Sequence, residues 1–184
     1  MPPLQSAMVA LGTPCPDFTL PDPRGFRMSR DDARGRPLLV LFLCNHCPFV
    51  KHVRAEIAGI AREWIPRGIS VAGISSNDPV SYPDDAPEKM AAEACDAGYC
   101  FPYLFDGSQE VARAFDAQCT PDCFLYDASH RLVYRGQIDD SRPKSAAPVT
   151  GADLRAALAA VLAEAAPIAE QKPSIGCSIK WRTA

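Results

Sequence analysis

One stretch of fifteen residues decides the fold of this chain: Leu38 to His52, which reads LLVLFLCNHCPFVKH. Its first part, Leu38 to Leu43, is an unbroken apolar run of the length expected for a strand buried on both faces. Pro48 then opens a new segment, and proline is favoured at the first position of a helix. Behind it, apolar residues recur at spacings of three and four: Val50, Val53, Ile57, Ile60 and Trp64. The sequence therefore predicts a buried strand that leads directly into a helix, with Cys44 and Cys47 at the junction.

This junction suits an anion. The backbone N–H groups of the first helical turn have no partner within the helix, and the positive end of the helix dipole points the same way. A thiolate is such an anion. Two cysteines at a helix start beside a histidine favour reactive thiols over buried structural ones.

The composition limits the class of protein. The chain has 184 residues, 47% of them hydrophobic, and a net charge of −3. This length predicts a single α/β domain over residues 1–184. The balance of charge predicts no nucleic-acid partner and no membrane surface. Neither a signal peptide nor a segment of membrane-spanning length is visible, so we expect a cytoplasmic protein.

Cysteine is unusually frequent for such a protein. The eight cysteines are Cys15, Cys44, Cys47, Cys95, Cys100, Cys119, Cys123 and Cys177. In a reducing compartment most thiols stay free, so cysteines in suggestive positions are expected to be catalytic, redox-sensing or metal-binding rather than structural.

The flanking segments complete the expected fold. Residues 1–36 are read as an N-terminal hairpin extension with a turn at 23–25, and Ser29 as the cap of one helical turn. A second buried strand over 69–74 makes a strand-helix-strand unit with parallel pairing. Further expected elements are helices over 87–97 and 109–115, an extended piece over 101–105, and an antiparallel hairpin over 124–134. Thr150 and Asp153 predict a capping box for a last helix, and the tail, 167–184, is apolar enough to pack back on the domain.

Together these pieces resemble the thioredoxin fold, a three-layer sandwich with a mixed central sheet and helices on both faces. The opening GTPCPDFTL at 12–20 is similar to the entry of the alkyl hydroperoxide reductase C and thiol-specific antioxidant (AhpC/TSA) proteins, the redoxins and peroxiredoxins. Three motifs resemble a peroxiredoxin-like bacterial subgroup: CNHCPFVKH at 44–52, CTPD at 119–122 and GCSIKW at 176–181. The resemblance covers nearly the whole chain.

The resemblance implies roles for particular residues. Alignment with thioredoxin strands puts Cys47 in the place of the nucleophile and Val50 in that of the resolving cysteine, so Cys44 is an extra thiol. We therefore expect Cys47 to be the catalytic nucleophile and Cys44 its nearest resolving partner. Thr120 and Pro121 resemble the cis-proline segment that presents its backbone to an extended substrate.

A reactive Cys47 needs more than its helix. A helix N-terminus contributes about 0.3 to 1 kcal/mol, which is less than one pKa unit. We expect further support from nearby donors and cations: the backbone N–H groups of Phe49 and Val50, and the side chains of His46, Lys51 and His52. Together these groups would lower the pKa toward the range of about 3.5 to 7.5 seen in reactive cysteines. Cys119, beside the Thr-Pro pair, is a further candidate to face the site.

The chain also departs from the peroxiredoxin pattern. In those proteins a Thr or Ser lies three positions before the peroxide-attacking cysteine, where this chain has Cys44 before Cys47. The arginine that peroxiredoxins place beside the thiolate would fall near Pro121, so this chain lacks it there. The sequence therefore leaves open the balance between peroxide and disulfide reduction.

The leading hypothesis is a thiol-based oxidoreductase without cofactor or metal that acts on disulfides and, as a second class, on peroxides. Its expected partners are a thioredoxin-like or low-molecular-weight thiol reductant, and the chain is expected to be a monomer or homodimer. One alternative is a zinc site built from Cys44, Cys47, Cys119 and Cys123, with His46 or His52 as substitutes. Another is a non-enzymatic redox-sensing or binding module. Cys177 would serve as the resolving thiol for Cys47 only if the tail crosses the site. No role is assigned to Cys15, Cys95, Cys100 or Cys123.

Overall fold

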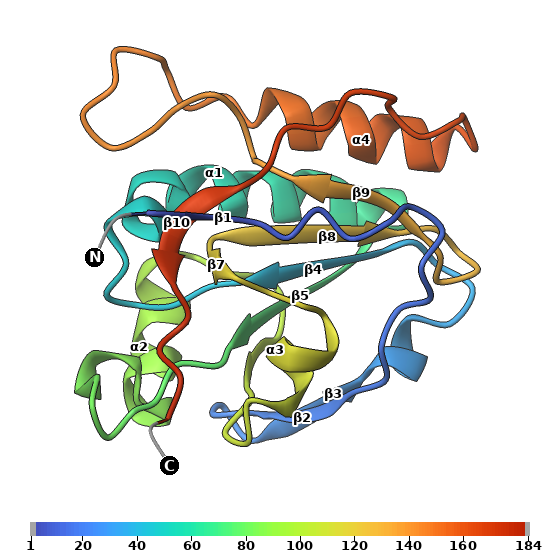
Figure 1. The fold of residues 1–184 in the computed structure, drawn as a ribbon. Coiled ribbons are helices and arrows are strands. Elements are labelled where there is room, and N and C mark those ends of the chain that lie inside the picture. The colour runs from blue at the N-terminus through green and yellow to red at the C-terminus, as the bar shows by residue number, and fades with distance from the viewer. Residues whose placement is uncertain (1–2, 183–184) are drawn as a thin grey trace.

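A five-stranded mixed sheet forms the centre of the protein. The computed structural model describes residues 3–182, and its main sheet has the strand order β6-β5-β4-β8-β9 (Figure 1). The strands are β4 (Leu38–Phe42), β5 (Ser70–Ser75), β6 (Tyr103–Phe105), β8 (Asp122–Tyr126) and β9 (Leu132–Gly136). β4 pairs in parallel with β5, and β5 with β6, whereas β8 runs antiparallel to both β4 and β9. The predicted mixed sheet is confirmed.

Two smaller sheets lie beside the main one. The predicted N-terminal hairpin is formed by β2 (Thr19–Asp22) and β3 (Phe26–Ser29). The second small sheet, in the order β1-β10-β7, joins β1 (Leu4–Gln5), β10 (Ile175–Ser178) and β7 (Cys119–Thr120). The helices are α1 (Pro48–Trp64), α2 (Pro87–Asp96), α3 (Glu110–Ala114) and α4 (Ala152–Leu162), with 3-10 turns η1 (Arg30–Ala33), η2 (Ile65–Arg67) and η3 (Pro83–Asp85).

The main sheet is covered on both faces, as the thioredoxin resemblance predicts. Alternate residues of β4 point to opposite sides: Leu39 and Leu41 enter the core beneath α1, α2 and α4, whereas Val40 and Phe42 enter the core shared with α3 and the β2–β3 hairpin. Figure 1 shows α1 and α4 on one side of the sheet and α3 with the hairpin on the other. Because both cores use the same sheet, this arrangement supports the proposal of one domain.

The strand-helix junction forms as its sequence predicts. All five residues of β4 are buried, and α1 begins at Pro48 directly after Cys47, its N-cap residue. The predicted inner face of α1 is buried in full, from Val50 to Trp64. This packing on both sides fixes the position of residues 44–47 at the end of the sheet.

The start of α4 differs from the expected capping box. Its N-cap residue is Gly151, with a φ of 65°. The backbone N–H groups of Thr150 and Gly151 donate to the carboxylate of Asp139, each at 2.7 Å, and Asp153 accepts a hydrogen bond from Gln137 instead. The capping prediction was wrong because the first-turn N–H groups find other partners: that of Ala152 donates to the Thr150 hydroxyl and that of Leu154 to the Ile138 carbonyl.

The tail packs back on the domain, as predicted, but it also contains a strand that the sequence did not reveal. β10 lies between β1 and β7, in the register Leu4↔Gly176 and Cys177↔Thr120. Figure 1 shows β10 crossing in front of the end of the main sheet where α1 begins. The segments β1 and β10, which lie near opposite ends of the chain, are therefore paired beside the strand-helix junction.

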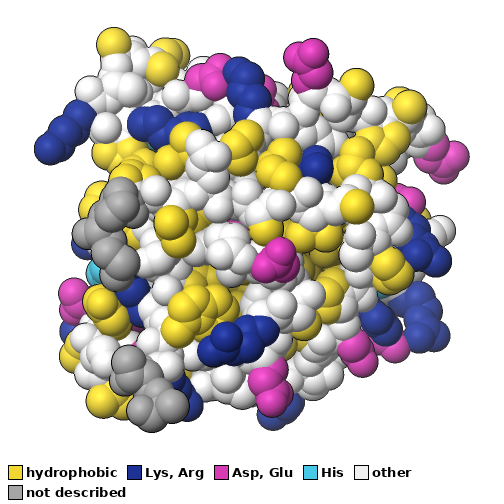
Figure 2. Space-filling model, viewed as in Figure 1, with side chains coloured by type: hydrophobic (Ala, Val, Ile, Leu, Met, Phe, Trp, Pro, Cys, Tyr) yellow, Lys and Arg dark blue, Asp and Glu magenta, His cyan; other side chains and the backbone are white. Residues whose placement is uncertain are grey.

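The visible surface carries no large field of one charge. On the face shown in Figure 2, basic and acidic side chains are interspersed with small apolar patches. Over the described part of the chain, none of the helices is long and apolar enough to cross a membrane.

Candidate active site

Cys47 lies at the centre of the candidate site. It is the N-cap residue of α1, and its side chain has no exposed surface. Its Sγ lies 3.2 Å from the backbone carbonyl oxygen of Thr120, to which it donates a hydrogen bond when it is protonated. This contact joins the helix start to β7, which contains the first two residues of the CTPD motif.

The surroundings of Cys47 favour a thiolate. A hydrogen bond from the Cys44 thiol is the largest cause, and it outweighs burial, which acts in the opposite direction. The Thr120 side chain and the backbone N–H groups of Val50 and Cys177 add to it, so that the pKa of Cys47 is lowered to about 5. The same hydrogen bond, together with burial, raises the pKa of Cys44. The pair thus holds one negative charge on Cys47, with Cys44 as its proton donor.

Thr120 lies against both cysteines. The Thr120–Pro121 peptide bond is cis, as the sequence predicts. The Thr120 hydroxyl lies 3.3 Å from the Cys44 Sγ, and the Thr120 carbonyl contacts Cys47. The backbone of Thr120, which the resemblance assigns to an extended substrate, already pairs with β10.

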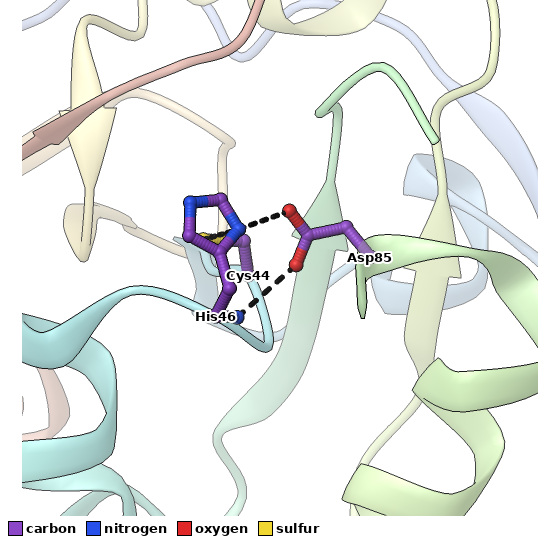
Figure 3. Close-up of side chains that lie close together, drawn as sticks. All are labelled: Cys44, His46 and Asp85. Atoms are coloured by element: carbon purple, nitrogen blue, oxygen red, sulfur yellow. Dashed lines mark hydrogen bonds and ion pairs between the residues drawn. The ribbon is translucent and has the colours of Figure 1, made fainter. Parts of the chain in front are cut away.

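Asp85 completes the site, and sequence reasoning missed it. Its carboxylate is fully buried and accepts hydrogen bonds from the backbone N–H groups of Asn45 and His46 and from the side chain of Asn77. Asp85 Oδ2 also lies 2.5 Å from His46 Nδ1. Figure 3 marks this contact with a dashed line. The only sequence signal of Asp85 is its place in an aspartate-rich loop after β5.

Asp85 and His46 form an ion pair next to the thiols. Burial opposes ionisation of Asp85, but the hydrogen bonds from His46 and Asn77 lower its pKa overall. The hydrogen bond that His46 donates to Asp85 in turn raises the pKa of His46, and the Cys47 charge adds to this effect. The Cys44 Sγ lies 4.0 Å from His46 Nδ1. The raised pKa favours the protonated form of His46, which lies beside the cysteine pair.

A surface hollow of about 320 Å³ opens next to this pair. Its lining includes His46, Phe49, Tyr82, Cys177, Ser178 and Lys180. The His46 ring stacks on Tyr82 with centroids 5.3 Å apart, and the Lys180 ammonium lies 5.6 Å from the same ring. The hollow thus combines two basic side chains with a thiol, that of Cys177.

The other predicted residues lie outside this contact set. Lys51 is exposed on the outer side of α1, where it lines a different hollow with Asp84 and Glu93. Cys119 is buried on β7, its thiol donates to the Pro121 carbonyl, and burial raises its pKa. His52 hydrogen-bonds to Ser141. The roles given to Lys51 and Cys119 therefore stay predictions.

The remaining cysteines divide by exposure. Cys15 and Cys123 are buried, and burial raises the pKa of each. Cys95 and Cys100 are exposed at the end of α2 and just beyond it. Cys177 is half-buried on β10.

The structure does not assemble the predicted four-sulfur zinc site. Among residues 3–182, the only set of three ligand atoms mutually within 4.8 Å belongs to Cys44, His46 and Asp85 (Figure 3). Two ligands of one tetrahedral zinc ion, each at about 2.1 Å, lie about 3.4 Å apart. The 2.5 Å between His46 Nδ1 and Asp85 Oδ2 is instead a hydrogen-bond distance. This geometry fits a shared proton better than a metal ion.

The fold and this cysteine pair define a thioredoxin-fold protein of the thiol-redox type. The sequence model of the AhpC/TSA family matches residues 11–135 of this chain. The chain belongs to the AhpC/TSA family, which confirms the resemblance drawn from the sequence motifs.

Solved structures agree with this fold. The crystal structure of an uncharacterized conserved protein from Geobacillus kaustophilus is similar at a TM-score of 0.97 and 47% identity, covering 100% of this chain and 98% of that one. A thiol:disulfide interchange protein of the thioredoxin family from Chlorobium tepidum has a TM-score of 0.65 at 21% identity, over 83% of this chain and 98% of that one. At that identity the second likeness shows the fold alone.

Curated relatives have thiol-redox names. A Mycobacterium tuberculosis protein, provisionally named a peroxiredoxin, is 33% identical over 107 residues, which are 58% of this chain. The chain spans 63% of the length of that relative. The thiol-disulfide oxidoreductase ResA of Geobacillus kaustophilus is 24% identical over 67% of each chain. The family and these names support the expected thiol-based function.

Proposed function

We propose that this protein is a thiol-based oxidoreductase whose nucleophile is Cys47 and whose substrates are small disulfides, with peroxides as a second class. One observation carries the proposal: Cys47 lies at the N-cap of α1, where the Cys44 thiol, the Thr120 side chain and the backbone donors together lower its pKa to about 5. At pH 7 such a cysteine is about 99% thiolate, against about 1% at a pKa of 9. The thiolate is the form that attacks disulfides and peroxides.

The surroundings favour a small, negatively charged disulfide. An extended protein substrate would need the backbone of Thr120, which β10 already uses. The hollow beside the site is lined by His46 and Lys180, and Asp85 raises the pKa of His46. Two positive charges in one concave surface attract carboxylate-bearing molecules. Small disulfides with acidic groups therefore fit better than peptides or cationic disulfides.

The catalytic cycle also needs a reductant. A thioredoxin-like protein or a low-molecular-weight thiol in the cytoplasm would return the oxidised enzyme to its dithiol form. We propose a monomer or homodimer for the active species, as the sequence suggests.

Steady-state assays test the proposed function. Reduction of an anionic, a neutral and a cationic small disulfide, and of hydrogen peroxide, is measured with a thiol reductant present in excess. Cys47→Ser is expected to abolish the enzymatic rate with every substrate. The matched control, Cys95→Ser, replaces an exposed thiol away from the site and is expected to retain full activity. Equal rates for Cys47→Ser and the wild-type protein would refute the assignment.

A further inference from the structure

The strand β10 covers the backbone of Thr120, which the resemblance assigns to an extended substrate. It pairs antiparallel with β7, with Cys177 opposite Thr120, the residue that precedes the cis-proline. Gly176 makes the closest approach: a Cβ at this position would lie 2.0 Å from the Thr120 carbonyl oxygen. Only glycine allows the two backbones to come so close. The tail thus occupies the backbone position that the fold offers to a substrate.

This placement brings Cys177 to the nucleophile. The Cys47 Sγ lies 3.2 Å from the carbonyl of Thr120, the residue that Cys177 faces across the small sheet. Cys177 also acts on the Cys47 thiol electrostatically, since its backbone N–H is among the causes that lower the pKa of Cys47. A disulfide requires the two sulfur atoms to approach to about 2.05 Å. Because Cys47 and Cys177 both lie against Thr120, closure of the bond needs a local movement of β10 and no rearrangement of the fold.

The strand is held on both sides of Cys177. On one side, the Ser6 N–H donates to the Ser174 carbonyl at 3.0 Å. On the other, the Lys180 N–H donates to Asn77 Oδ1 at 2.8 Å, and the Lys180 carbonyl accepts from Gln109. Because the anchors at Ser174 and Lys180 lie outside residues 175–178, they keep Cys177 near Cys47 when those residues move.

The three thiols differ in access. Cys44 and Cys47 are 1% and 0% exposed, whereas Cys177 is half-buried and lines the hollow that also contains His46 and Lys180. A molecule in this hollow therefore meets β10 before it meets Cys47. Cys47 can be reached when residues 175–178 move off Thr120, and the return of the strand brings Cys177 back onto the same sulfur.

We propose that Cys177 is the resolving cysteine of this protein, carried by a strand that acts as a built-in substrate, so that the oxidised form contains a Cys47–Cys177 disulfide. The inference rests on the proposed function of Cys47. This inference replaces our expectation from the sequence that Cys44 is the resolving partner of Cys47. Cys44 remains the hydrogen-bond donor that stabilises the Cys47 thiolate.

The reaction balances in two exchange steps. The Cys47 thiolate attacks one sulfur of the substrate disulfide, which forms a mixed disulfide with one half and releases the other half as a thiolate. The Cys177 thiol then attacks the Cys47 sulfur, its proton passes to the departing half, and the Cys47–Cys177 bond forms. Two electrons have moved from the protein to the substrate. The thiol reductant of the proposed function then restores both thiols.

A single-turnover experiment tests the assignment. The reference protein carries Cys95→Ser and Cys100→Ser, so that the exposed thiols do not consume the reagent. The reduced protein is mixed with one equivalent of dithiobis(nitrobenzoate), an anionic aromatic disulfide, quenched by alkylation and mapped by peptide mass spectrometry. The expected result is a Cys47–Cys177 link with both reagent halves released. A Cys44–Cys47 link in place of it would overturn the proposal.

Variants separate this inference from the proposed function. Cys177→Ser in the same background is expected to stop at a mixed disulfide on Cys47 and to slow release of the second half at least tenfold. Cys44→Ser, the matched control, is expected to form the Cys47–Cys177 link. Rapid release of both halves by Cys177→Ser would refute the role of Cys177 and would leave the proposed function of Cys47 intact. A Cys47→Ser protein that reacts like the reference would refute the proposed function itself.

A backbone variant provides an independent check that leaves all three thiols in place. Gly176→Ala must push β10 away from Thr120, since the new methyl group has no room. Alkylation of Cys47 is expected to become at least tenfold faster, and closure of the Cys47–Cys177 disulfide slower. Circular dichroism confirms that each variant is folded. Unchanged alkylation of Cys47 in a folded Gly176→Ala protein would show that β10 does not cover it.

Discussion

Removal of the Cys44 thiol should raise the pKa of Cys47. The Cys44 hydrogen bond is the largest cause of the low value, about 5. A hydrogen bond to a charged group contributes about 1.5 to 3 kcal/mol, which corresponds to about 1 to 2 pKa units. Cys44→Ala is therefore expected to move the pKa of Cys47 to about 6 to 7. At pH 6 the thiolate fraction would fall from about nine-tenths to between one-tenth and one-half.

The ultraviolet absorbance of the thiolate, followed against pH, measures this change without access to the buried sulfur. Cys47→Ser identifies the absorbance that belongs to Cys47. Cys44→Ser is the matched control, because its hydroxyl can still donate a hydrogen bond, and it is expected to stay closer to the wild-type protein. An unchanged pKa in Cys44→Ala would show that the helix N-terminus and the backbone donors suffice, contrary to our reasoning.

Three further predictions follow from the same geometry. Asp85→Asn should lower the pKa of His46 toward 6.5. Asp85 raises that pKa, so the wild-type protein is expected to be more stable than Asp85→Asn below pH 6.5. This difference in stability is lost as pH rises through the folded pKa of His46. Thermal melts recorded across pH measure it. Lys180→Ala should reduce kcat/KM for an anionic small disulfide about threefold to tenfold and leave a neutral one unchanged, and equal losses for both would refute electrostatic selection. Gly176→Ala should lower the melting temperature by several degrees, because it breaks the β7–β10 contact, and an unchanged melt would contradict that packing.

The strand-helix junction was predictable because its signals are local. The apolar run before Cys44 and the three- and four-residue spacing after Pro48 determine their structure wherever they occur, and both elements form as expected. The Thr120–Pro121 segment was predicted from a short motif that carries its own geometry. These pieces place Cys47 at the helix start without knowledge of the remaining chain.

Asp85 and β10 could not be found in the same way. Asp85 lies 39 positions from His46, and only tertiary packing decides which aspartate of its loop turns inward. The strand β10 is short, with glycine and serine among its four residues, and it forms because the Thr120 backbone is available to pair with it. Gly176 was the one usable signal, since glycine inside an apolar tail often marks a close backbone approach.

The identity of the first cysteine to react tests the central claim most directly. The reduced protein carrying Cys95→Ser and Cys100→Ser, which removes the two exposed thiols, is mixed with a small anionic disulfide, quenched with acid within milliseconds to seconds, and each cysteine-containing peptide is quantified by mass spectrometry. Our account predicts that the mixed disulfide on Cys47 is the first adduct to form, before any adduct of Cys44 or Cys177, and that this order also holds below pH 7. Initial modification of Cys44 or Cys177, with Cys47 still reduced, would contradict it.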